Sequence, residues 1–232
     1  MPLSEANFRK TIERLLTSPL TLREIMRRLK LKGDQRAQTR ERIRALAADG
    51  FIVHIRGARY GLPEKMNLVT GVVQGHRDGY GFVIPGNAAL PDVFIGARNF
   101  DEAMHGDRVV CRVESRRADG RAEGRVIRVL DRAHETLAGR FQEARGAGFV
   151  TPFETRIVQE LFIPPGKTQG ARDGQAVVAR ILEHPAKQRQ AQGEIIRVLG
   201  DPEDPSVELA IVTARYHLRA EFPPAALTEA AA

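Results

Sequence analysis

An internal repeat constrains this sequence more than any other feature. Four blocks recur in the same order at offsets of 67 to 69 residues: GFVIP at 81 as GFVTP at 148, DVFI at 92 as ELFI at 160, GDRVV at 106 as GQAVV at 174, and GRVIRVL at 124 as GEIIRVL at 193. Ordered matches at a nearly constant offset indicate a duplicated folding unit. The 232-residue chain therefore holds several small domains rather than one large enzyme domain.

The first copy alternates apolar and polar residues in short runs separated by Gly, Pro and Asp. The runs are LVTGVVQGH, YGFVIP, DVFIG, DRVVCRVES and AEGRVIRVL. Each run predicts a strand, and five short strands with polar turns favour a small closed barrel of the OB type. We expect such barrels over residues 67–133 and 134–222, with residues 223–232 as a linker tail.

The segment before the first barrel, residues 1–66, predicts three helices and a β-hairpin. Phe8 and Ile12 repeat at helical spacing after Ser4, which can cap the first helix. TLRE at Thr21 has the spacing of a capping box, and a third helix follows over QRAQTRERIRALAAD, with Asp34 as a candidate cap. FIVHIRGARYGLP then alternates like two short strands. The expected fold class is α+β and multidomain, with an N-terminal winged helix-turn-helix before two OB barrels.

The basic charge is concentrated in this N-terminal module. Lys and Arg outnumber Asp and Glu by 15 to 7 over residues 1–70, whereas the counts are 10 and 10 over 71–137 and 11 and 12 over 138–232. Such a concentrated positive field favours phosphate backbones or another polyanion. The candidate contacts lie on the third helix and the hairpin: Arg36, Arg40, Arg44, Arg56 and Arg59. A solvated face, with Glu41 pairing locally, is the alternative.

Aromatic residues concentrate in RDGYGFVIP and DVFI. Because residues two apart share a face of a strand, Tyr80 and Phe82 point outward if Val83 faces the core. Phe94 lies between two β-branched residues and is expected on the same outer face, where bases can stack on the rings. Gly79 and Gly81 would leave room beside the rings. The alternative is that the rings fill the barrel interior.

These motifs carry a resemblance to known families. DGYGFV with DVFI resembles the two RNA-binding motifs of cold-shock domains. The order of a basic winged helix, GVVQGHRDGYGFVIP, GDRV and a second related barrel resembles the N-terminal region of the ribonuclease R family, among the RNase II exoribonucleases. The resemblance implies cold-shock-like barrels and RNA-binding residues at Tyr80, Phe82, Phe94, Arg77, Arg98, Phe149 and Phe162. Ala147 replaces the first ring in the second barrel, so its platform is expected to be poorer.

The same resemblance implies a magnesium-dependent catalytic domain with clustered Asp residues, which follows the barrels in the family. We expect this chain to stop before that domain, to bind no cofactor or metal and to be inactive by itself. Its densest carboxylates are Asp101, Asp107, Asp201 and Asp204. Asp107 opens the strand GDRVV, and the last two lie in the Pro-broken turn GDPEDPS, so metal binding is not expected. We nominate no catalytic residue. The single cysteine, Cys111, is expected to be a buried strand residue.

The expected function is therefore RNA binding for a 3′ to 5′ exoribonuclease. The barrels would guide single-stranded RNA, and the winged helix would grip structured or duplex nucleic acid. Two alternatives stay open: a free-standing DNA-binding regulator, and a docking module for ribosome or degradosome proteins. The sequence contains neither a long apolar run nor a signal peptide, so we expect a cytoplasmic protein without a membrane partner.

Overall fold

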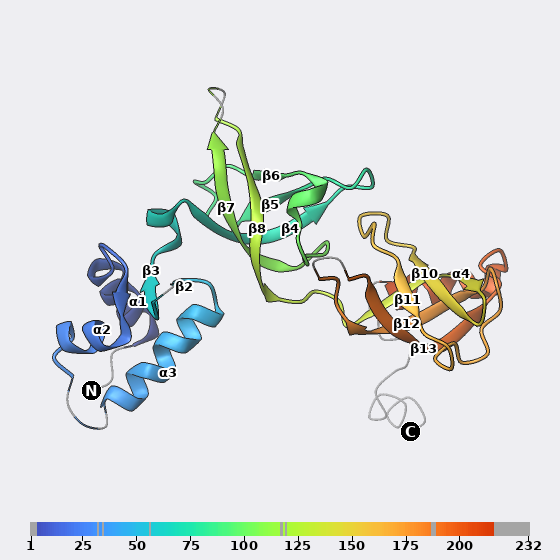
Figure 1. Cartoon of the computed structure of the whole chain (residues 1–232), viewed down its shortest axis with the longest axis horizontal. Coiled ribbons are helices and arrows are strands. Elements are labelled where there is room, and N and C mark those ends of the chain that lie inside the picture. The colour runs from blue at the N-terminus through green and yellow to red at the C-terminus, as the bar shows by residue number, and fades with distance from the viewer. Residues whose placement is uncertain are drawn as a thin grey trace, which may run out of the picture. The chain divides into compact units, whose positions relative to one another are not determined.

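The computed structural model describes residues 4–31, 33, 35–55, 57–116, 118, 120–186 and 189–215 (Figure 1). Asp34, Arg56 and the expected linker tail lie outside these residues. The chain divides into two compact units, one of residues 1–74 and 80–132 and the other of residues 75–79 and 133–232. None of the helices in the described segments is long and apolar enough to cross a membrane. The boundaries expected for three separate domains stay a prediction.

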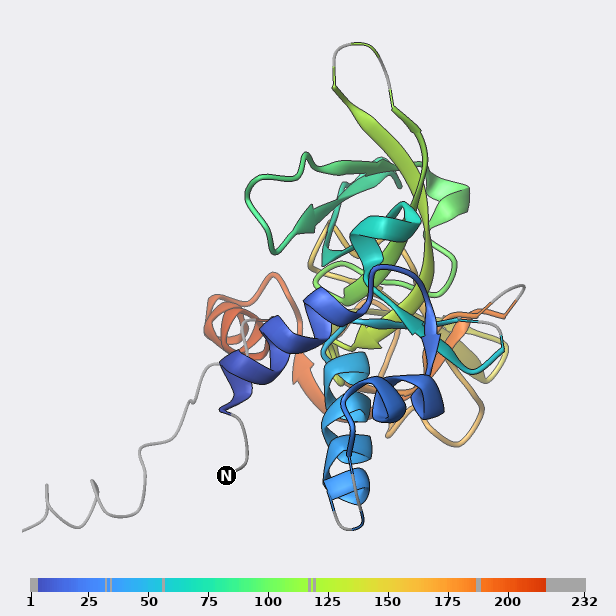
Figure 2. The same cartoon turned by 90° about the vertical axis from the view of Figure 1, so that its left-hand side faces the viewer.

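The N-terminal elements follow the order of a winged helix-turn-helix. They are α1 (Glu5–Leu15), β1 (Leu20–Thr21), α2 (Leu22–Arg28), α3 (Gln35–Ala48), β2 (Val53–Ile55) and β3 (Arg59–Gly61). The sheet has the strand order β1-β3-β2, and β1 is a strand that the sequence analysis did not predict. Figure 2 shows the three helices gathered around this small sheet.

Local capping fixes where the first two helices begin. The backbone N–H of Asn7 donates to the Ser4 hydroxyl over 3.4 Å at the start of α1. At α2 the capping box is complete, because Thr21 N donates to Glu24 Oε2 over 2.8 Å and Glu24 N donates to Thr21 Oγ1 over 3.3 Å. Both predicted caps are confirmed. The helices then bury a common core that includes Ile12 and Ile43.

Two closed five-stranded barrels follow, as the sequence predicts. The first has the order β4-β5-β6-β8-β7 and the second the order β10-β11-β13-β12-β9. In both barrels the third strand pairs with the fifth in parallel, and the other described strand pairs are antiparallel. The strands of the first are β4 (Leu68–Gly75), β5 (Gly81–Pro85), β6 (Val93–Ile95), β7 (Arg108–Arg116) and β8 (Ala122–Asp131). Those of the second are β9 (Thr136–Ala144), β10 (Ala147–Pro152), β11 (Leu161–Ile163), β12 (Ala176–Glu183) and β13 (Ala191–Gly200).

A fourth helix, which the sequence analysis missed, follows the second barrel. Helix α4 spans Pro205–Arg215, and Val207 is buried. At its start the Asp204 carboxylate accepts a hydrogen bond from the backbone N–H of Ser206 over 2.8 Å. At its end Arg215 Nη2 lies 3.0 Å from Glu154 Oε2. Hydrogen bonds from Arg156 and Arg215 outweigh burial and hold the pKa of Glu154 far below its usual value.

Cys111 lies in β7 with no exposed surface, which confirms the prediction of a buried strand residue. Burial raises the pKa of its thiol to about 12, with a further contribution from the nearby charge of Glu114. Since the thiolate is the reactive form, Cys111 should resist alkylation by iodoacetamide in the native protein at pH 8 and react readily in denaturant. Mass spectrometry of the intact chain measures both. Rapid native labelling would contradict this account of Cys111.

Candidate functional site

The aromatic residues of β5 and β6 lie on the outside of the first barrel, whereas Phe100 packs in its core. Val83, Val93 and Ile95 are at most 1% exposed and face the core. Phe82 and Phe94, which pair with each other across β5 and β6, alternate with these residues and face outward: Phe82 is 37% exposed and Phe94 is half-buried. The outward direction predicted from the alternation of β5 and β6 is therefore confirmed. The alternative, with the rings filling the barrel interior, is wrong.

Tyr80, Phe82 and Phe94 form one cluster. The ring centroids of Tyr80 and Phe94 are 5.7 Å apart, those of Phe82 and Phe94 5.8 Å, and those of Tyr80 and Phe82 6.2 Å. Phe82 meets both neighbours edge to face, with interplanar angles of 85° and 70°. The rings fix one another's orientation in this way. The cluster is a faceted apolar surface rather than a flat sheet.

The glycines around the rings have roles other than the expected one. Gly81 is buried and alternates with Phe82, so it faces the barrel interior instead of leaving room beside the rings. Gly79 has a φ of +88°, a conformation that side-chain-bearing residues rarely adopt. It turns the chain into β5. The expectation that Gly81 opens space for nucleic acid is therefore wrong.

The two arginines that flank the ring-bearing strands in the sequence, Arg77 and Arg98, are exposed. Arg77 lies in the loop between β4 and β5, with Nε 3.9 Å from the carboxylate of Asp78. Arg98 lies in the short helix η2 (Ala97–Asn99), just after β6. A pocket of about 730 Å³ opens beside the rings and is lined by Phe82 and Phe94, by Asp92, and by Arg121 and Glu123 at the start of β8. Asp92, Arg121 and Glu123 are not among the site residues predicted from the sequence.

The second barrel repeats the arrangement with two rings. Phe149 in β10 pairs with Phe162 in β11, and their centroids are 5.5 Å apart. Both are half-buried, while the strand neighbours Gly148 and Val150 face the interior. Ala147 stands where the first barrel has Tyr80. The second barrel thus presents a smaller aromatic surface.

Arg36, Arg40 and Arg44 lie on the exposed side of α3 but differ in their partners. Arg44 Nη1 lies 2.9 Å from Glu41, the local pair that the sequence suggested, and Arg36 Nε donates to the carbonyl of Leu31 over 3.1 Å. No described residue forms a hydrogen bond or ion pair with the exposed side chain of Arg40. Arg59 is exposed on β3. The pKa of Glu24 is lowered, mainly by the hydrogen bond from the Thr21 backbone and to a smaller extent by the charge of Arg59.

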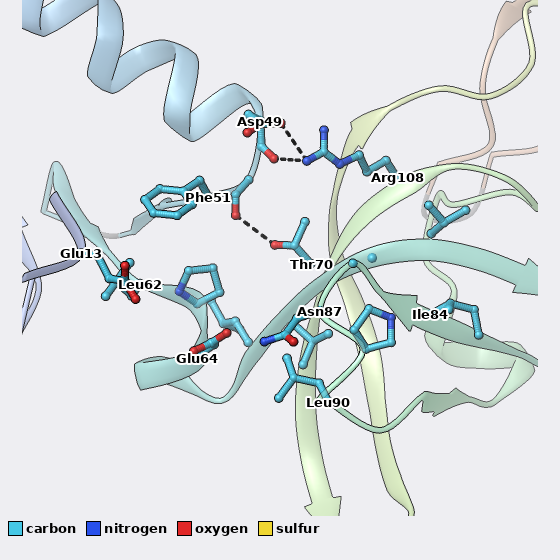
Figure 3. Close-up of a pocket in the computed structure, with 18 of the residues that line it drawn as sticks. Glu13, Asp49, Phe51, Leu62, Glu64, Thr70, Ile84, Asn87, Leu90 and Arg108 are labelled. Atoms are coloured by element: carbon cyan, nitrogen blue, oxygen red, sulfur yellow. Dashed lines mark hydrogen bonds and ion pairs between the residues drawn. The ribbon is translucent and has the colours of Figure 1, made fainter. Parts of the chain in front are cut away.

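Within the first unit, a pocket of about 580 Å³ lies between the end of α3 and the first barrel (Figure 3). Asp49 accepts hydrogen bonds from Arg108 Nη2 over 2.9 Å and from Arg9 Nη2 over 2.6 Å. Burial opposes ionisation of Asp49, but these arginines outweigh it, so the net effect is a lowered pKa. Thr70 Oγ1 also donates to the carbonyl of Gly50 over 3.1 Å. The network fixes the end of α3 to β4 and β7.

Asp107, Asp201 and Asp204, three of the four carboxylates considered above, have structural partners. Asp107 is 1% exposed and accepts hydrogen bonds from Met104 N and Arg132 Nη1, each over 3.0 Å. Asp201 accepts a hydrogen bond from Glu203 N over 3.0 Å. In the part of the chain that the structure describes, no three His, Cys, Asp or Glu side chains form a group that can hold a metal ion.

Comparison with known proteins agrees with this architecture. Residues 71–129 match the Ribonuclease B OB domain family, and residues 149–223 match the Cold shock domain family. Ribonuclease R of Acidithiobacillus ferrooxidans is 35% identical over 213 residues, which cover 91% of this chain and 48% of that protein. Ribonuclease R of Escherichia coli (strain K12) is 36% identical over 185 residues, covering 79% of this chain and 22% of that protein. A structure of Mycoplasma genitalium RNase R in complex with ribose methylated single-stranded RNA matches with a TM-score of 0.60 and 16% identity, covering 68% of this chain and 25% of that one.

The fold defines a protein with tandem OB barrels of the cold-shock class, which follow an N-terminal helical region with a small sheet. The relatives add the narrower assignment. The chain belongs to the ribonuclease R family. It spans about half the length of the first relative and about a fifth of the second.

Proposed function

We propose that this chain is the RNA-binding portion of a ribonuclease R-type 3′ to 5′ exoribonuclease. The first barrel guides single-stranded RNA by stacking bases on Tyr80, Phe82 and Phe94, and the winged helix grips nucleic-acid backbone through α3. The observation that carries the proposal is the outward cluster of three rings, with Phe82 37% exposed. Exposed rings do not stabilise the fold of an isolated barrel, whereas the aromatic face of any base can stack on them.

Two further observations support this proposal. A solved relative with the same fold, Mycoplasma genitalium RNase R, was determined with ribose methylated single-stranded RNA. The net charge of +7 over the whole chain, concentrated before residue 71, suits a polyanionic ligand. The proposal places the chain in the cytoplasm and leaves magnesium to the family's catalytic domain.

Fluorescence anisotropy with three ligands tests the proposal. Unstructured RNA, duplex RNA and duplex DNA of random sequence are titrated with the full chain across a salt series. The expected result is tighter binding of unstructured RNA than of either duplex, without a requirement for one particular sequence. A preference for one duplex DNA sequence would support a DNA-binding regulator instead. Equally weak binding of all three ligands would support a protein-docking module.

Arg40 provides a separate test of the winged helix. If its unpaired guanidinium contacts a phosphate, Arg40→Ala should reduce the slope of log K against log salt for duplex RNA by nearly one. Arg14→Ala, which removes the same charge from the exposed side of α1, is the matched control and should leave the slope nearly unchanged. Equal changes in both variants would mean that only net charge matters and that α3 makes no specific contact.

A further inference from the structure

A row of three side chains crosses the outer face of the first barrel. Phe82 in β5 lies opposite Phe94 in β6, and Phe94 lies opposite Glu123 in the parallel strand β8. Neighbouring strands are about 4.8 Å apart, so the Glu123 side chain stands one strand beyond the Phe94 ring. A base stacked on Phe94 is wide enough to bring one of its edges to the Glu123 carboxylate.

The surroundings leave this carboxylate available. Glu123 and Asp92 both line the pocket beside the rings, together with Phe82 and Phe94. Glu123 is partly exposed and Asp92 exposed, and neither has a hydrogen bond or ion pair with any residue in the described ranges. The aromatic pocket therefore contains two carboxylate groups that have no partner among the described residues.

We propose that Glu123, assisted by Asp92, makes the first barrel select the base stacked on Phe94, with guanine preferred and uracil disfavoured. This inference rests on the proposed RNA binding by the rings. An ionised carboxylate only accepts hydrogen bonds. Guanine presents two adjacent donors, N1–H and the N2 amino group, which match the two carboxylate oxygens. Uracil presents one N–H between two carbonyl oxygens, which the carboxylate repels.

The second barrel offers a natural comparison. The same row there consists of Phe149, Phe162 and Gln192, so an amide replaces the carboxylate. Glu160, which the repeat aligns with Asp92, accepts a hydrogen bond from Thr151 Oγ1 over 2.9 Å. An amide both donates and accepts and can therefore serve any base. Glu123→Gln thus gives the first barrel the same Phe, Phe and Gln row as the second barrel, and the new side chain has nearly the same shape as the old one.

The test compares the full chain with two variants on three unstructured RNAs by fluorescence anisotropy. The RNAs are a uridine decamer, an alternating guanosine–uridine decamer, and the same decamer with inosine replacing guanosine, which removes the N2 amino group. The wild-type chain should bind the guanosine RNA roughly tenfold more tightly than the uridine RNA, with the inosine RNA between them. Glu123→Gln should abolish most of this ratio. Asp131→Asn, at the exposed far end of β8, removes the same charge and should preserve the ratio.

The outcomes separate the inference from the function beneath it. If Glu123→Gln and wild type show the same guanosine-to-uridine ratio while both still bind RNA, base selection by Glu123 is wrong and RNA binding stands. If Asp131→Asn also loses the ratio, the effect is one of net charge and the inference is likewise overturned. If the wild-type chain binds none of the RNAs, the proposed function itself fails.

Discussion

Replacing Phe82 and Phe94 together with alanine is expected to weaken the binding of a uridine decamer by roughly 30-fold or more. Each ring that stacks a base contributes about 1 to 3 kcal/mol, and two rings are lost. Because neither substitution removes a charge, the salt dependence of binding should remain unchanged. Anisotropy titrations at several salt concentrations measure both quantities.

Two controls make this result specific. Phe149→Ala with Phe162→Ala removes the same surface from the second barrel, and its effect should be smaller because that barrel lacks a third ring. Phe82 and Phe94 lie outside the core of the first barrel, so circular dichroism should show the variant folded. A folded double variant with wild-type affinity would show that RNA does not stack on these rings.

Gly124→Ala is expected to destabilise the first barrel by about 2 kcal/mol or more. Gly124 lies in β8 where β7 passes closely, and a Cβ atom built there collides with the carbonyl oxygen of Arg112 and lies 3.0 Å from Cys111 Sγ. Backbone atoms cannot move aside as a flexible side chain can, so the strand pair must distort. Hydrogen exchange followed by mass spectrometry reports on each barrel separately.

Peptides from β7 and β8 should exchange faster in Gly124→Ala, while peptides from β12 and β13 keep the wild-type rate. Gly96→Ala is the matched control, since the nearest atom to its added Cβ is 4.0 Å away and its φ is −68°. That variant should exchange like the wild type. Unchanged protection of β7 and β8 in Gly124→Ala would contradict the close approach of these strands.

Local patterns made most of the fold predictable. Capping at Thr21 depends on residues three apart, and the strands depend on alternation over a few positions, so both can be read from short windows. The outward direction of Phe82 followed from the same alternation, once Val83 was assigned to the core. The internal repeat then extended each conclusion to the second barrel.

Features that depend on distant contacts were missed. Glu123 becomes a neighbour of Phe94 only through the parallel pairing of β6 with β8, which joins strands separated by a long segment. AEGRVIRVL predicted only a strand, and nothing in this run indicates that Glu123 lies beside the rings. The ion pair of Asp49 with Arg108 joins the N-terminal helical region to the first barrel, and no local pattern signals it. Helix α4 had a local signal in the Asp-Pro-Ser start at Asp204, which was interpreted only as a turn.

Photo-crosslinking tests the central claim most directly. A decamer of 4-thiouridine is bound to the full chain, irradiated, and the crosslinked peptides are identified by mass spectrometry. The account predicts crosslinks on peptides that contain Tyr80, Phe82 or Phe94, and their loss when an unlabelled uridine decamer competes. Crosslinks confined to peptides from other faces of the barrels or from the helices would contradict it.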